Sequence, residues 1–167
     1  MGHMALLRNL RNLLDNKVEP SKFIPLLVES AEKGQQLPFR YYSAYQQIKD
    51  KSPPNVLDAV EECLNRSIGN LGKLFGKTMC LSDNSGSAQG AFTSSLGSMK
   101  VSTIGNLSGI LAGMISDEGY LGVFGDKLDV MPIRKSSSVF DQLEKAEKSA
   151  QSIGMNTENG IWIFLRD

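Results

Sequence analysis

Two consecutive prolines, Pro53 and Pro54, divide the chain into two parts with different sequence patterns. Proline cannot continue a helix that precedes it, and it suits the first turn of a helix that follows it. Before the prolines, apolar residues recur at helical spacing only, whereas after them apolar strands alternate with helical stretches. We therefore expect a helical part (residues 4–52), a connector helix (53–76) and an α/β part (77–167).

The helical part is predicted to contain three short helices. The first carries five leucines on one face, the second runs from Pro20 to Gly34, and the third runs from Phe39 to Ile48. Each is too short to bury its apolar face alone, so stacked helical pairs, as in a solenoid, are expected. The connector helix is expected to end near Gly72, with its acidic residues on a solvated face.

The α/β part is predicted to begin with a strand over residues 78–81, followed by a polar loop and a helix ending near Ile115. A hairpin is expected over residues 120–133. Ser138, with Asp141 three residues on, is typical of a helix start, and this helix is expected to reach Gly154. Strands that alternate with helices predict a mainly parallel sheet with helices on its faces.

The composition is that of a folded globular protein and not of a membrane protein or a strongly basic nucleic-acid-binding protein. The 41% hydrophobic residues suffice for a core, and Lys+Arg and Asp+Glu both total 18, so no net charge draws the whole chain toward nucleic acid or membrane. The sequence has no apolar run of about 20 residues and no start that resembles a signal peptide. We therefore expect a cytoplasmic protein with no membrane partner.

Histidine and cysteine usage argues against an enzyme. The only histidine, His3, lies in residues 1–4, which resemble a cloning remnant and are excluded from the expected fold. Without another histidine there is no Ser-His or Cys-His nucleophile pair and no imidazole metal site. Cys63 and Cys80 lack metal-ligand spacing, and Cys80, in an apolar stretch, is expected to be buried and inert.

The most informative polar residues directly follow the first predicted strand: Asp83, Ser85 and Ser87. In parallel sheets, ligands bind outside the carboxyl ends of the strands. Gly86 allows a tight bend that could direct the alternate side chains toward one point. One carboxylate and two hydroxyls are hard ligands that suit Mg²⁺ and not metals that prefer sulfur or imidazole. The alternative is a Ser- and Gly-rich turn with no ligand.

This motif is similar to the metal-ion-dependent adhesion site of von Willebrand factor A domains, and the chain from about Lys77 onward resembles such a domain. The preceding strand, the following order of helix, hairpin and helix, and Thr157 in the loop that carries the family's third hydroxyl all support the resemblance. It implies that Ser85, Ser87 and Thr157 bind Mg²⁺ or another divalent cation, with Asp83 acting through water. An acidic group of a protein ligand would complete the coordination.

Two residues depart from the family pattern. A further Asp, after the next strand, has no counterpart because the sequence ends at Asp167, and Ala88 stands where Met is frequent. The resemblance thus implies a truncated, Rossmann-like von Willebrand factor A domain with a weak cation site. The truncation would expose the edge of the first strand, and self-association of the chain is therefore expected.

The helical part also resembles a known family. Residues 8–14, 37–45 and 64–67 look like the closing helices of a TROVE module, a ring of HEAT-like helical repeats, and TROVE followed by a von Willebrand factor A domain is the architecture of the Ro ribonucleoprotein family. The resemblance implies binding of non-coding RNA, either Y RNA or misfolded small RNA, in the full-length protein. The candidate RNA-contacting residues are Arg8, Arg11, Arg40, Lys49 and Lys51.

Three functional hypotheses remain open at this point. The leading one is a non-catalytic, RNA-binding Ro-like fragment whose Mg²⁺ site holds an acidic ligand. The second is an Mg²⁺-dependent protein-interaction domain with no RNA role. Tyr41, Tyr42 and Tyr45, beside Arg40, could stack on bases, but aromatic residues at helical spacing usually fill the core. The third, an Mg²⁺-dependent phosphoryl hydrolase, lacks a general base and a phosphate-binding Gly-Lys loop.

Overall fold

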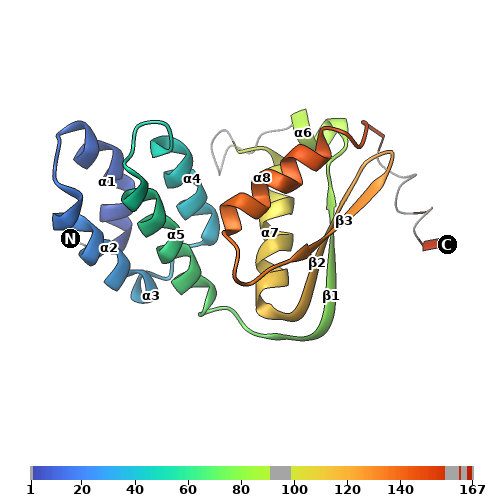
Figure 1. Ribbon diagram of the computed structural model, residues 1–167, viewed down its shortest axis with the longest axis horizontal. Helices are drawn as coiled ribbons and strands as arrows, with labels where there is room; N and C mark the ends of the chain where they lie inside the picture. Colours follow the sequence, from blue (N-terminus) through green and yellow to red (C-terminus); the bar gives the residue numbers. More distant parts are fainter. Residues whose placement is uncertain (1, 91–98, 157–161, 163–164, 167) are drawn as a thin grey trace. The chain divides into compact units, whose positions relative to one another are not determined.

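The computed structural model describes residues 2–90, 99–156, 162 and 165–166. The chain forms two compact units, Met1–Gly72 and Lys73–Asp167. Each unit can be followed by itself in Figure 1, the first in blue to green and the second in green to red. The first is helical and the second is mixed α/β.

The first unit consists of short helices with proline at three of their starts. Its elements are α1 (His3–Asp15), α2 (Pro20–Glu29), α3 (Ala31–Gly34), α4 (Pro38–Ile48) and α5 (Pro54–Ile68). Proline lies in the first turn of α2, α4 and α5, where its missing N–H has no intrahelical partner to lose. The single helix expected from Pro20 to Gly34 is interrupted at Ser30, whose Oγ donates to the Leu26 carbonyl at 2.6 Å.

Helix α5 is part of the core of this unit. It packs against α2, α3 and α4, and it ends at Ile68, four residues before the predicted end. The acidic residues of α5 lie opposite its buried face, at the surface or half-buried. The largest side chains of the unit with less than 2% exposure are those of Tyr41, Leu10, Leu27, Ile48, Leu64, Val56 and Val60.

His3 belongs to this core, contrary to its exclusion on sequence grounds. Its side chain lies in the first turn of α1 and is 5% exposed. Nδ1 lies 3.1 Å from the Leu27 carbonyl oxygen and 3.0 Å from Ser30 Oγ, and Nε2 lies 2.9 Å from Tyr41 Oη. Burial lowers the pKa of His3 and raises the pKa of Tyr41 to about 12.

The second unit is built on a sheet whose described strands are β1 (Leu74–Asp83), β2 (Ser116–Phe124) and β3 (Leu128–Ile133), in that order. Strands β1 and β2 are parallel, and β2 and β3 form the expected hairpin. Helix α7 (Val101–Ile115) precedes β2, and α8 (Val139–Ala150) packs against α7, β2 and β3. The Ser138 hydroxyl caps α8 by accepting from the Asp141 N–H at 3.1 Å, although the helix ends before Gly154.

Strand β1 is longer than the sequence predicts. The prediction placed its start after Gly76, but Gly76 lies inside the strand with φ of +78°, at a shift in the register with β2. Glycine tolerates this conformation, and the pairing of β1 with β2 is irregular at this point. The Gly76 N–H donates to Asp117 Oδ2 at 2.9 Å, so a β2 side chain bonds the irregular residue.

Helix α7 approaches the sheet closely along three glycines spaced four residues apart. A Cβ atom at Gly105 would lie 2.7 Å from Ser82 Oγ, one at Gly109 would lie 2.5 Å from Leu121 Cδ1, and one at Gly113 would lie 2.7 Å from Ile133 Cγ1. Real Cβ atoms do not come so close to other atoms. Larger residues at these positions would therefore push α7 away from the strands.

The sheet also has an exposed apolar face. On β1, the side chains of Phe75, Met79 and Leu81 are 81%, 37% and 41% exposed, and Val130 on β3 is 37% exposed. Leu81 pairs with Gly122, which in turn pairs with Val130, and Met79 lies two residues before Leu81, so Met79, Leu81 and Val130 share one face of the sheet. Cys80 points to the opposite face and is half-buried, less buried than expected, and burial raises its pKa.

None of the helices among the described residues has both the length and the apolar character that crossing a membrane requires.

Candidate functional site

The loop with the predicted cation ligands lies at the carboxyl edge of the sheet. Asp83 is the last residue of β1 and pairs with Phe124, the last residue of β2. The Asn84 N–H donates to the Phe124 carbonyl at 2.8 Å, which extends the strand pairing one residue into the loop. Helix α6 (Gly86–Gly90) follows directly, at the end of β1 in Figure 1. The structure thus places the loop at the edge where parallel sheets bind ligands.

The loop brings Asp83, Ser85 and Ser87 together. Ser85 Oγ lies 3.2 Å from Ser87 Oγ, and the Ser85 N–H donates to Asp83 Oδ1 at 2.8 Å. The Ser85 side chain is only 1% exposed, whereas Asp83 is half-buried and Ser87 is exposed. One polar group is therefore buried at the base of the site and two are open to solvent.

The spacing of the two hydroxyls fits a hard cation. Neighbouring ligands of octahedral Mg²⁺, each at about 2.1 Å, lie about 3.0 Å apart. The 3.2 Å between Ser85 Oγ and Ser87 Oγ is close to this distance. Asp83 Oδ1 already accepts the Ser85 N–H, which leaves Oδ2 for a bridging water. No cluster of three or more His, Cys, Asp or Glu side chains able to hold a metal occurs among the described residues.

The predicted third hydroxyl, that of Thr157, lies outside the described residues. The residues just before it lie against the site: the Gly86 N–H donates to the Met155 carbonyl at 3.1 Å. The Asn156 N–H donates to Asp126 Oδ1 at 2.9 Å, and Asp126 lies in the turn between β2 and β3. Asp126 is missing from the sequence-based site, although its place two residues after the end of a predicted strand was a signal that could have found it.

Sequence reasoning also missed a buried polar pair under the loop. Asn84 and Asn106 are 1% and 0% exposed, and their side-chain amides exchange two hydrogen bonds of 2.9 Å each. The signal in the sequence was an asparagine within the apolar stripe of the helix that became α7.

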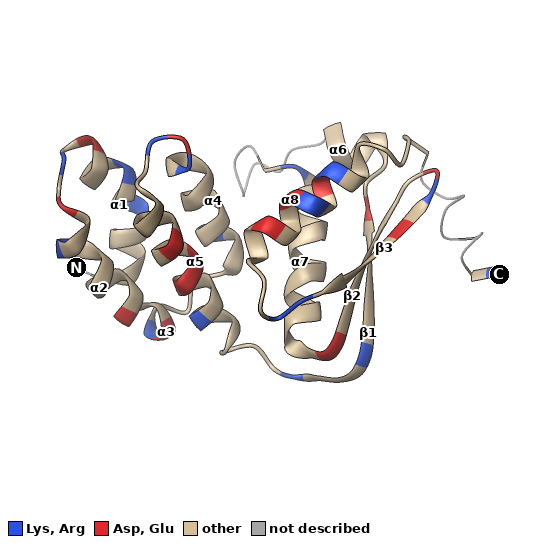
Figure 2. Cartoon of the chain, in the orientation of Figure 1, with Lys and Arg blue, Asp and Glu red and all other residues tan. Residues whose placement is uncertain are grey.

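The candidate RNA-contacting residues are all exposed in the helical unit. They are spread over α1, α4 and the turn after α4: Arg8, Arg11, Arg40, Lys49 and Lys51. The helical unit includes α5 and its acidic residues. Residues 1–72 therefore contain nine Lys and Arg and eight Asp and Glu, so the unit has almost no net charge. Figure 2 shows the acidic residues of α5 in red and the basic residues on several elements. Tyr41 and Tyr42 are buried, as the core interpretation predicted.

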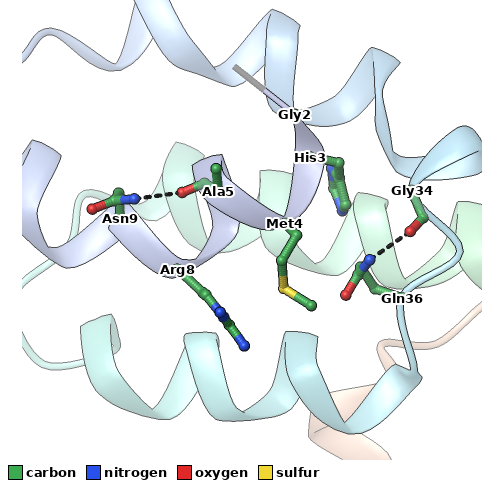
Figure 3. A pocket seen from close by; sticks show the side chains of 8 residues that line it. All are labelled: Gly2, His3, Met4, Ala5, Arg8, Asn9, Gly34 and Gln36. Carbon is green, nitrogen blue, oxygen red and sulfur yellow. Dashed lines mark hydrogen bonds between the residues drawn. The ribbon is translucent and has the colours of Figure 1, made fainter.

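A cavity of about 570 Å³ lies in the helical unit, between the start of α1 and the segment after α3. Its lining residues, labelled in Figure 3, include the basic residue Arg8. Asn9 donates to the Ala5 carbonyl at 2.7 Å, and Gln36 donates to the Gly34 carbonyl, so both amides are already bonded within the unit. Of the candidate RNA-contacting residues, Arg8 lines this cavity and the other four do not.

Comparison with known proteins gives one informative result. No protein family model and no curated protein sequence matches the chain. Among solved structures, the crystal structure of the Ro (RSR) protein of Deinococcus radiodurans is similar over 94% of this chain, with a TM-score of 0.62 and 17% sequence identity. The chain spans 34% of the length of that protein. The protein described here therefore has a Ro-like fold of mixed α and β structure.

Proposed function

We propose that this chain is a non-catalytic, cytoplasmic ligand-binding part of a Ro-like ribonucleoprotein. In it, the loop from Asp83 to Ser87 binds Mg²⁺ and, through the cation, an acidic group of a protein ligand. The observation that carries the proposal is the pair of hydroxyls 3.2 Å apart beside a carboxylate at the carboxyl edge of the sheet. The Ro-like fold supports it.

The residues of the loop have different roles in this proposal. Ser85 and Ser87 hold the cation through their hydroxyls, with Thr157 as a third ligand, and Asp83 acts through a water molecule. These hydroxyls are neutral, so a bound Mg²⁺ keeps much of its positive charge and attracts a carboxylate. Burial of Ser85 fixes one hydroxyl at the base of the site, whereas the exposure of Ser87 leaves the outer side open to a partner.

Calorimetric titration with Mg²⁺ and Mn²⁺ tests the site. Ser85→Ala should weaken binding at least about tenfold, because it removes a direct ligand. Ser108→Ala is a matched control, since Ser108 is exposed on α7 and its hydroxyl donates only to the Ile104 carbonyl, at 2.8 Å. Equal affinities in the wild type and in Ser85→Ala would refute the cation site.

We place any RNA contact in the helical unit of the full-length protein, at Arg8, Arg11, Arg40, Lys49 and Lys51. All five are exposed, and Arg11 also lies 3.6 Å from Asp15. This chain alone should bind RNA weakly, with a dissociation constant above about 1 μM at physiological salt, because its first unit has an excess of only one positive charge. Nanomolar, sequence-selective binding to single-stranded or hairpin RNA would contradict this expectation.

A second candidate function is an Mg²⁺-dependent protein-interaction domain with no RNA role. The near balance of charge in residues 1–72 and the burial of Tyr41 and Tyr42 favour it. Salt and chelator distinguish the two candidates. RNA binding should fall steeply as salt rises and be unaffected by EDTA, whereas capture of an acidic protein ligand should be lost with EDTA.

A further inference from the structure

Two asparagine side chains form a closed pair directly beneath the loop that carries Asp83 and Ser85. Asn84 Nδ2 donates to Asn106 Oδ1 at 2.9 Å, and Asn106 Nδ2 donates to Asn84 Oδ1 at 2.9 Å. Both residues are buried, at 1% and 0% exposure. A buried amide that loses its partner destabilises a protein by about 1–3 kcal/mol, so each asparagine depends on the other.

Asn84 forms hydrogen bonds with residues of four different elements, β1, β2, α6 and α7. Its N–H donates to Phe124 of β2 at 2.8 Å, and its carbonyl accepts from Gln89 of α6 at 2.6 Å. Its side-chain Nδ2 also lies 3.0 Å from the Ser82 carbonyl of β1, in addition to the pair with Asn106 of α7. Asn84 stands between Asp83 and Ser85 in the chain. Fixing its backbone and side chain therefore fixes the direction of both neighbours.

The position of Asn106 depends on the close approach of α7. Gly105, the preceding residue, lies where a Cβ atom would come within 2.7 Å of Ser82 Oγ. This approach lets the short side chain of Asn106 reach Asn84. Leu107 and Ile110 beside it are fully buried, so the surroundings on α7 would also accept an apolar residue. Burial alone therefore does not explain an amide at this position.

We infer that Asn106 is a positioning residue for the cation site: through Asn84 it holds Asp83 and Ser85 in the geometry that binds the cation. Asn106 does not itself contact the cation. The inference rests on the proposed function, because it assigns to α7 control over the affinity of that same loop. Residues that orient metal ligands typically change metal affinity by about 10–100-fold when they are replaced.

The test uses the full chain and Mn²⁺ as the probe. Asn106→Leu removes both hydrogen bonds of the pair and leaves Asn84 Oδ1 without its donor, whereas Asn84 Nδ2 keeps the Ser82 carbonyl. The double variant Asn84→Leu with Asn106→Leu removes both amides, so neither side chain of the pair is left without its partner, and the Ser82 carbonyl loses the Asn84 donor. Ser108→Leu is the matched control, because it places the same side chain on an exposed position of α7. For each variant, Mn²⁺ affinity, the free energy of unfolding in urea, and hydrogen exchange of the Ser85 amide are measured.

We expect Asn106→Leu to lose both stability and about tenfold or more in Mn²⁺ affinity. The double variant should regain stability but not affinity, and its Ser85 amide, now with a disordered Asp83 acceptor, should exchange faster than in the wild type. Ser108→Leu should match the wild type. A folded double variant with wild-type Mn²⁺ affinity would overturn the inference, and so would unchanged Ser85 exchange. Absence of Mn²⁺ binding in the wild type would instead overturn the proposed function. The exchange rate of the Ser85 amide in the double variant would then still show whether Asn106 and Asn84 hold the loop in place.

Discussion

The two units of this protein differ in the polar side chains that they bury. In the described part of the helical unit the buried polar residues are His3 and Ser67. In the described part of the α/β unit they are Ser82, Asn84, Ser85, Ser102, Thr103, Asn106, Ser116 and Gln142. Apolar packing is not directional, whereas buried hydrogen bonds fix the orientation of the groups that make them. The contrast indicates that the second unit, and its carboxyl edge above all, is built to hold particular side chains in place.

The largest expected effect is a loss of stability of the second unit, with the stability of the first unit unchanged. Gly109→Val should destabilise the α/β unit by about 3 kcal/mol, because its side chain would overlap Leu121 and Cys80. Urea unfolding followed by circular dichroism, together with Mn²⁺ titration, measures the loss. Cation binding should weaken with it, since α7 holds the loop.

Leu27→Ala gives the reciprocal comparison. Leu27 is fully buried in the helical unit, so the change should cost that unit a similar amount and leave Mn²⁺ affinity unchanged. If Gly109→Val behaved as the wild type, or if Leu27→Ala abolished cation binding, the separation between the units would be wrong.

A smaller effect is expected at β1, an outer strand of the sheet among the described residues, where we propose that copies of the chain associate. Leu81→Lys places a charge on the exposed apolar face and should shift the chain toward monomer. Val101→Lys is the matched control, because Val101 is about as exposed but lies on α7. Light scattering on a size-exclusion column gives the masses. A wild type that stays monomeric across micromolar concentrations would refute the association.

The smallest effect concerns the pH dependence of the helical unit. Burial lowers the pKa of His3, so between that lowered pKa and the ordinary value of about 6.5 the unfolded chain binds more protons than the folded one. Stability should therefore rise with pH through this window and be lost as pH falls below about 6.5. His3→Gln should remove the dependence.

The single histidine makes the measurement direct. One imidazole Cε1–H signal in a proton NMR titration should report the midpoint. A midpoint at or above the value of the unfolded chain would show that the buried position of His3 is wrong.

Features set by nearby residues could be read from the sequence. The cap at Ser138 needs only Asp141, and the hairpin needs only its two strands and their turn. The loop at Asp83 follows the same rule. The strand before it predicts its position at the end of that strand, and its alternating polar residues are the candidate cation ligands. The structure accordingly brings together Asp83, Ser85 and Ser87 as predicted.

Features set by distant residues could not be read in this way. The hydrogen bonds of His3 join residues 24 and 38 positions away, and those between Asn84 and Asn106 span 22 positions. Gly76 looked like a strand boundary, but the β2 partner that bonds it lies 41 residues on. Each of these outcomes depends on which segments meet in the fold, and local periodicity contains no information about that.

The glycines of α7 have a consequence for the order in which the second unit forms. Three glycines in a 15-residue helix reduce its intrinsic stability by about 3 kcal/mol relative to alanine. A peptide of this sequence should therefore be mostly unstructured in water, and the helix should form only when the strands are present to pack against it. In native-state hydrogen exchange, the amides of α7 should open together with those of β1 and β2 as one cooperative segment. Helix α7, which holds the loop at Asp83 through Asn106, should therefore form late in folding, after the sheet that it covers.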